Sequence, residues 1–82
     1  MKHTINEIIG KRIVGVIVKE SDRWPKSQLF LLFDDYTYFE LYSTYDEIRG
    51  AGDIDKGGQA EIKELGKGSH KIVLEFHDDP LQ

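Results

Sequence analysis

The chain has 82 residues, no cysteine and a formal charge of −4. This length fits one domain spanning residues 1–82, and the lack of cysteine excludes disulfides, thiolate catalysis and cysteine-based zinc sites. A net negative charge argues against nucleic acid as a partner unless basic residues cluster. A small cysteine-free domain favours a cytoplasmic setting. We expect no signal peptide and no membrane partner, because the longest apolar run, residues 29–33, has five residues.

The N-terminal residues predict a short helix. Thr4 and Glu7 have the spacing of a capping box, in which each side chain satisfies a free backbone donor. Three isoleucines then fall on one helical face, at positions 5, 8 and 9. Gly10 suits the position just past the helix end. A helix of this length is marginal alone, so its isoleucine face must pack on the rest of the domain.

A first strand is predicted over residues 12–19, where apolar residues point to both faces. Apolar residues on both faces indicate a central strand or one covered by the N-terminal helix. Gly15 interrupts the pattern and indicates either a bulge or a close approach of another backbone.

Residues 29–33 and 36–42 are two aromatic-rich runs around Asp34-Asp35, which predicts a β-hairpin. Two turns are possible, with either residues 34–35 or residues 35–36 at the centre. Both place Phe30 and Leu32 on one face together with Thr37, Phe39 and Leu41. We expect this face to belong to the core, because the opposite face carries the tyrosines and Glu40.

The second half of the chain is less regular. A turn of helix is expected near residues 44–49, followed by a glycine-rich acidic loop to residue 58. Residues 59–65 fit neither period cleanly, and we favour a strand over a helix there. A last strand is predicted over residues 70–76, with Ile72, Leu74 and Phe76 inward, and residues 78–82 form a frayed tail.

Together these elements predict an α+β fold, with a short N-terminal helix followed by a twisted antiparallel sheet of four or five strands that is partly rolled into a barrel. The predicted core consists of Ile5, Ile8, Ile9, Val14, Val16, Val18, Phe30, Leu32, Phe39, Leu41, Ile72, Leu74 and Phe76.

The leading functional hypothesis is a non-catalytic binding or regulatory module that contacts a protein partner or a second copy of itself. Tyrosine gives a large contact area at low entropy cost and keeps a polar group. The predicted interaction surface consists of Trp24, Tyr36, Tyr38, Glu40, Tyr42 and Tyr45. The alternative is that these rings are covered by the loop that follows them.

A second hypothesis is calcium binding. Asp53, Asp55 and Glu64 occupy positions 1, 3 and 12 of a calcium loop that has Gly58 at position 6. The match is incomplete, because position 5 is Gly57, which has no oxygen-bearing side chain. A glycine-rich acidic surface loop is the simpler interpretation.

A third hypothesis is weak nucleic-acid binding through the basic residues of the first third, which are Lys11, Arg12, Arg23 and Lys26. No enzyme is expected, because no nucleophile lies beside a base and the three histidines are scattered. No cofactor is expected either. The sequence names no partner.

Overall fold

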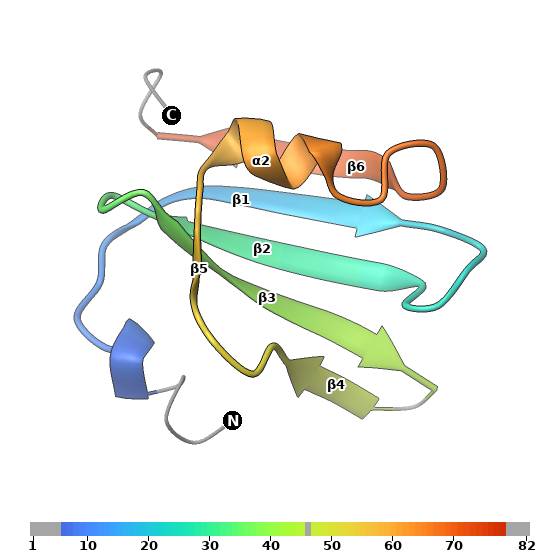
Figure 1. The fold of residues 1–82 in the computed structure, drawn as a ribbon, viewed down its shortest axis with the longest axis horizontal. Coiled ribbons are helices and arrows are strands. Elements are labelled where there is room, and N and C mark those ends of the chain that lie inside the picture. The colour runs from blue at the N-terminus through green and yellow to red at the C-terminus, as the bar shows by residue number, and fades with distance from the viewer. Residues whose placement is uncertain (1–5, 46, 79–82) are drawn as a thin grey trace.

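A computed structural model describes residues 6–45 and 47–78 and shows an open antiparallel sheet (Figure 1). Its strand order is β4-β3-β2-β1-β6, and β5 pairs with β3. The strands are β1 (Ile13–Glu20), β2 (Ser27–Phe33), β3 (Thr37–Thr44), β4 (Glu47–Gly50), β5 (Asp55–Lys56) and β6 (Lys71–His77). Helix α2 (Gln59–Glu64) and a helical turn at residues 6–8 complete the described elements.

The predicted antiparallel α+β class is therefore confirmed, with three corrections. The described part of the chain has six strands in place of four or five, and the sheet does not close into a barrel. Helical structure also occurs outside the N-terminal region, at α2. The expected helix start at Thr4, the core position Ile5 and the tail beyond Asp78 lie outside the described residues.

The loop between β2 and β3 has three residues, 34–36, and not two. Tyr36 has a φ of 62°, the left-handed conformation that typically ends a three-residue hairpin loop. The side chain of Thr37 donates a hydrogen bond to Asp35, and Lys11 forms an ion pair with the same carboxylate. An odd number of loop residues reverses the facing of the strand that follows, compared with a two-residue loop.

The observed register pairs Phe30 with Glu40 and Leu32 with Tyr38. Phe30 and Leu32 therefore share a face with Tyr38, on the opposite side of the sheet from Phe39. The sequence prediction that these two residues share a face with Thr37, Phe39 and Leu41 is therefore wrong.

One face of the sheet, the helix face, carries α2 and the segment that leads to it, as Figure 1 shows. The side chains buried together on this face are Val14, Ile17, Phe30, Leu32, Tyr38 and Ile62. Ile17 and Phe30 are opposite each other in neighbouring strands, and the Phe30 and Tyr38 rings meet edge to face at 5.9 Å. These contacts make the helix face the main core.

Gly15 marks a bulge, as the sequence indicates, because the register of β1 against β2 shifts between Ile13 and Gly15. It also permits a close approach: a Cβ at this position would lie 2.9 Å from Nδ1 of His77 and 3.1 Å from the carbonyl oxygen of Phe76. The bulge turns Val14 onto the helix face, where it is buried.

The strand expected over residues 59–65 is wrong, because residues 59–64 form α2. Most residues of this segment are good helix formers, and the Glu61 carboxylate accepts a 2.8 Å hydrogen bond from the backbone N–H of Gly58 at the N-terminus of the helix. Ile62 is the buried residue of α2. Lys19 donates to the carbonyl oxygens of Ile62 and Leu65 at the other end.

The helical turn expected near residues 44–49 is also wrong, because β4 occupies residues 47–50. Tyr45 has a φ of 50° and lies in the turn between β3 and β4. The chain then pairs back onto β3, with Thr44 opposite Glu47. Tertiary pairing has overridden a local capping signal here.

The last strand is confirmed as β6, but its predicted facing is wrong. The register against β1 shifts between Leu74 and Ile72, which are paired with Val18 and Lys19. This bulge places Ile72 on the same face as Lys19 and Leu74 on the other. Leu74 and Phe76 are 51% and 70% exposed, so neither belongs to the core.

Of the other residues predicted for the core, some are buried and some are exposed. Val14, Phe30, Leu32 and Phe39 are buried as expected. Ile8 is half-buried and Ile9 is 73% exposed. The buried residues that the sequence analysis did not assign to the core are Ile17, Lys19, Phe33, Tyr38 and Ile62.

Candidate interaction surfaces

The predicted tyrosine surface is not one surface, because Tyr38 is only 6% exposed. The segment between β5 and α2 passes over its ring: a Cβ at Gly57 would lie 3.3 Å from the ring of Tyr38. Burial raises the pKa of Tyr38, and the nearby carboxylates of Asp55, Glu40 and Glu61 act in the same direction. Tyr38 is a core residue with a polar hydroxyl group.

Tyr36, Glu40 and Tyr42 have separate environments. Tyr36 is exposed and hydrogen-bonded to Glu61. This bond is the largest cause of the raised pKa of Tyr36. Glu40 accepts a 2.8 Å hydrogen bond from Gln28, which is paired with Tyr42 across the helix face. Glu40 and Tyr42 therefore lie on the helix face. Tyr36 lies in the hairpin loop, beside Glu61 of α2.

Trp24 and Tyr45 do form an exposed pair. Their ring centroids are 4.9 Å apart, and they are 50% and 84% exposed. The ammonium group of Lys26 lies 5.1 Å from the Trp24 ring centroid, within the range of a cation–π contact. This pair stands at the end of the sheet formed by the loops after β1 and β3, away from Tyr36 in the turn after β2.

The three residues of the predicted calcium loop do not converge. Asp53 accepts a 2.9 Å hydrogen bond from the backbone N–H of Ile54, Asp55 begins β5, and Glu64 ends α2 within 3.6 Å of Lys67. Among residues 6–45 and 47–78, no three histidine, aspartate or glutamate side chains gather as metal ligands would.

The four basic residues considered for nucleic-acid binding are divided between the two ends of the sheet. Lys11 pairs with Asp35, and Arg12 pairs with Asp78 at 2.6 Å. Arg23 and Lys26 lie in the loop between β1 and β2. Two further lysines, at positions 67 and 71, line hollows beside this loop. The basic side chains that lie close together are therefore those around the β1–β2 loop, at positions 23, 26, 67 and 71.

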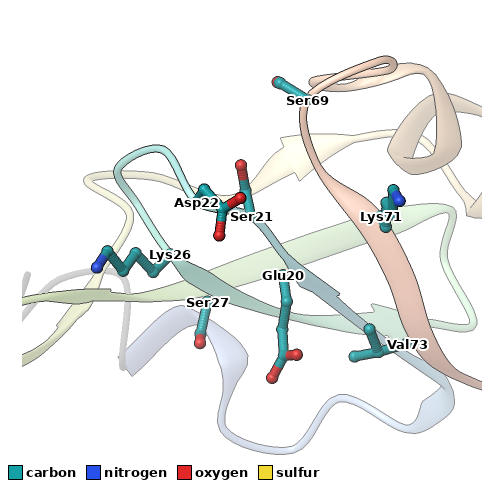
Figure 2. Close-up of a pocket in the computed structure, with 8 residues that line it drawn as sticks. All are labelled: Glu20, Ser21, Asp22, Lys26, Ser27, Ser69, Lys71 and Val73. Atoms are coloured by element: carbon teal, nitrogen blue, oxygen red, sulfur yellow. The ribbon is translucent and has the colours of Figure 1, made fainter.

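A shallow polar hollow of about 470 Å³ lies between the β1–β2 loop and β6 (Figure 2). Its lining includes two lysines, two carboxylates and three serines. Figure 2 shows that these groups do not point at a common centre: Lys26 extends away from the others, and Glu20 and Ser27 point to a different side from Ser69. Among these eight lining residues, no base is oriented toward a nucleophile.

The sequence analysis missed a different surface, on the face of the sheet opposite α2. We call it the apolar face. Two rows of apolar side chains cross it from β3 to β6, in register through β2 and β1. The first row is Leu41, Leu29, Val18 and Leu74. The second row is Phe39, Leu31, Val16 and Phe76.

Exposure increases along both rows toward β6. Phe39 at the β3 end is 2% exposed, whereas Leu74 and Phe76 at the other end are 51% and 70% exposed. Beside the β3 end of the first row, Val18, Leu29, Leu41 and Ile48 line an apolar hollow of about 250 Å³. The sequence signal for this surface was the presence of apolar residues on both faces of the first strand. Helix α2 can cover only one of these two faces.

Comparison with protein-family models, with curated proteins and with solved structures found no match. The functional argument therefore rests on the surfaces just described. No helix in the described ranges is long and apolar enough to cross a membrane.

Proposed function

We propose that the protein is a small non-catalytic binding module that self-associates, with a second copy covering the β6 end of the apolar face. The observation that supports this most strongly is the exposure of Leu74 and Phe76 at the end of two apolar rows. Full burial of one such side chain contributes about 1.5–3 kcal/mol. Covering both of them together with their neighbour Val73, which is 54% exposed, favours association.

The position of β6 supports the same proposal. It is an edge strand, paired with β1 on one side within the described sheet. Long apolar edge strands are typical sites of pairing with another chain. Its register shift at Val73 places Leu74 and Phe76 on the apolar face, opposite to the face of Ile72. A partner that packs there reaches both the edge and the face.

A second copy suits this face better than a charged partner. Its rows contain no ionisable group, and Glu20 and Lys71, which are opposite each other in β1 and β6, lie at one end. A surface with an apolar centre and a charged margin is typical of a protein interface. In a twofold dimer the same patch must complement itself, and two apolar sheet faces do so by packing about 10 Å apart.

Sedimentation equilibrium of wild type and of Phe76→Lys tests the proposal. Phe76 is exposed, so the change leaves the fold intact while placing a charge in the centre of the interface. We expect a concentration-dependent dimer in the wild type and a dissociation constant at least about tenfold weaker in the variant, as at an interface hot spot. Tyr45→Lys, at an exposed ring outside the apolar face, is the control and dimerises like wild type. A monomeric wild type, or equal loss in both variants, refutes the proposal.

A further inference from the structure

We infer that the loop end of the sheet binds single-stranded nucleic acid through a cationic hollow and the Trp24–Tyr45 pair, at a site that adjoins the charged margin of the apolar face at Lys71. The hollow measures about 560 Å³ and is lined by Arg23, Lys67 and Lys71 together with the hydroxyls of Ser21 and Ser69. The acidic residue in the lining of this hollow is Asp22. Three cations and two hydroxyls around one acid form a site that suits a phosphate group.

The charge of this end departs from that of the whole molecule. The hollow and the adjacent one in Figure 2 share Ser21, Asp22, Ser69 and Lys71. Together they contain four cations, at positions 23, 26, 67 and 71, against the carboxylates of Glu20 and Asp22. Lys67 is also 3.6 Å from Glu64. An excess of positive charge at this end of a chain with a net charge of −4 is a local electrostatic footprint for an anion.

The two loops that form the hollow are held together by hydrogen bonds. Nε2 of His70 lies 2.8 Å from the carbonyl oxygen of Pro25, which joins the α2–β6 loop to the β1–β2 loop. The hydroxyl of Ser69 donates to the carbonyl of Gly66 at 3.1 Å. Within the other loop, the backbone N–H of Ser21 donates to the carbonyl of Lys26 at 2.9 Å. The cations are therefore attached to loops whose relative positions are fixed.

Trp24 lies on the same loop as Arg23 and Lys26, and its partner Tyr45 lies in the turn between β3 and β4. Trp24 follows Arg23 directly, its ring contacts Tyr45, and Lys26 lies over its face. An exposed ring beside cations is the combination that binds single strands, because bases stack on the ring while phosphates follow the charge. A double strand keeps its bases stacked internally and cannot use the ring in this way. The structure thus places basic side chains beside the exposed ring of Trp24.

The single tryptophan of the chain is Trp24, so its fluorescence reports the proposed contact directly. We expect a short oligothymidylate at low salt to quench this fluorescence. The binding constant falls as salt rises, with a log–log slope of about −0.7 for each phosphate contacted, so three cations predict a slope near −2. Inorganic polyphosphate and a blunt DNA duplex of equal charge serve as comparison ligands.

Three variants locate the site by the anisotropy of a labelled oligothymidylate. Lys67→Glu with Lys71→Glu should weaken binding at least about tenfold and flatten the salt dependence. Trp24→Ala should weaken it about fivefold or more, the value of one stacked base. Lys56→Glu, in the exposed strand β5, is a charge-reversal control away from the hollow and should change affinity far less, per reversed charge, than the double variant. Circular dichroism confirms that each variant is folded.

Each other outcome overturns the inference. Absence of binding at low salt overturns it outright. Equal binding of polyphosphate without an effect of Trp24→Ala shows a general anion site, and equal binding of the duplex excludes single-strand recognition. Phe76→Lys, which tests self-association, should leave the quenching in place, so the two proposals fail separately.

Discussion

The buried ammonium group of Lys19 donates hydrogen bonds to the carbonyl oxygen of Ile62 and thereby joins the central strand β1 to helix α2. Lys19 is 1% exposed, lies over the ring of Phe30 at 5.7 Å and also bonds the carbonyl of Leu65. The carbonyl of Ile62 also accepts a 3.1 Å hydrogen bond from the backbone N–H of Leu65, so Lys19 adds a second donor at the C-terminus of the helix, where carbonyl groups run short of partners. Burial lowers the pKa of Lys19, and the attraction of Glu40 and Glu64 partly opposes that effect.

Replacing Lys19 should therefore destabilise the fold by an amount that depends on the substitute. Lys19→Ala removes the hydrogen bonds to both carbonyl groups and opens a cavity, so we expect a loss of about 2–4 kcal/mol. Lys19→Met fills the space and removes the cost of burying a charge, so its loss should be about half as large. Urea unfolding measures both. Equal stability of wild type and Lys19→Ala would contradict the role assigned to this lysine.

Ile62 anchors α2 to the sheet, since it is fully buried on the helix face. We expect Ile62→Ala to cost about 2–5 kcal/mol and to increase hydrogen exchange in the segment around α2, because little else of that helix is buried. Glu64→Ala, at an exposed position of the same helix, is the control and should stay within about 0.5 kcal/mol. A small effect of Ile62→Ala would mean that α2 is not docked.

Gly15 sets the distance between β1 and β6. A Cβ there would meet His77 and the backbone of Phe76, so Gly15→Ala should force the strands apart and cost about 1–3 kcal/mol. Gly52 has open space around the same position, and Gly52→Ala should be neutral or slightly stabilising, by up to about 1 kcal/mol. Thermal unfolding of the two variants compares them directly. If both behave alike, the close approach at Gly15 does not constrain the sheet.

Glu75 should make stability depend on acid pH. Lys63 lies 2.8 Å from its carboxylate and His77 lies 2.7 Å away. The hydrogen bond from Lys63, followed by that from His77, lowers the pKa of Glu75. A lowered pKa in the folded state means that the ionised carboxylate stabilises the fold above its unfolded value of about 4.3, and this contribution disappears as the pH falls through the folded value.

The difference in unfolding free energy between wild type and Glu75→Gln should therefore be largest near neutral pH and should shrink below about pH 4. Urea unfolding across a pH series measures it. In a Lys63→Met background the same difference should be smaller at neutral pH, because the main partner is gone. A difference that does not change with pH would show that Glu75 is not involved.

The sequence predicts the strands of this protein better than it predicts their facing. Alternation identifies β1, the hairpin strands and β6, because half-buried strands have a period of two. The side on which Phe39 lies depends on whether the hairpin loop has two or three residues, and the sequence offers no glycine or asparagine to settle this. The register shift at Val73 has no local signal either, since it depends on how β6 pairs with β1.

The same limit applies to the sites. Trp24 and Tyr45 are exposed, whereas the burial of Tyr38 depends on a segment that folds over it from the next part of the chain. The basic cluster combines Arg23 with Lys67 and Lys71, and only the pairing of β1 with β6 brings these residues together. Such long-range neighbours cannot be read from local patterns.

Intermolecular nuclear Overhauser effects in a mixture of isotope-labelled and unlabelled protein test the self-association of this domain most directly. The apolar face predicts contacts between the ring of Phe76 or the methyl groups of Leu74 in one copy and the apolar rows of the other. Contacts at these positions, lost in Phe76→Lys, are the expected result. An absence of intermolecular contacts at concentrations that yield good spectra, or contacts confined to the loop end around Trp24, would contradict the account.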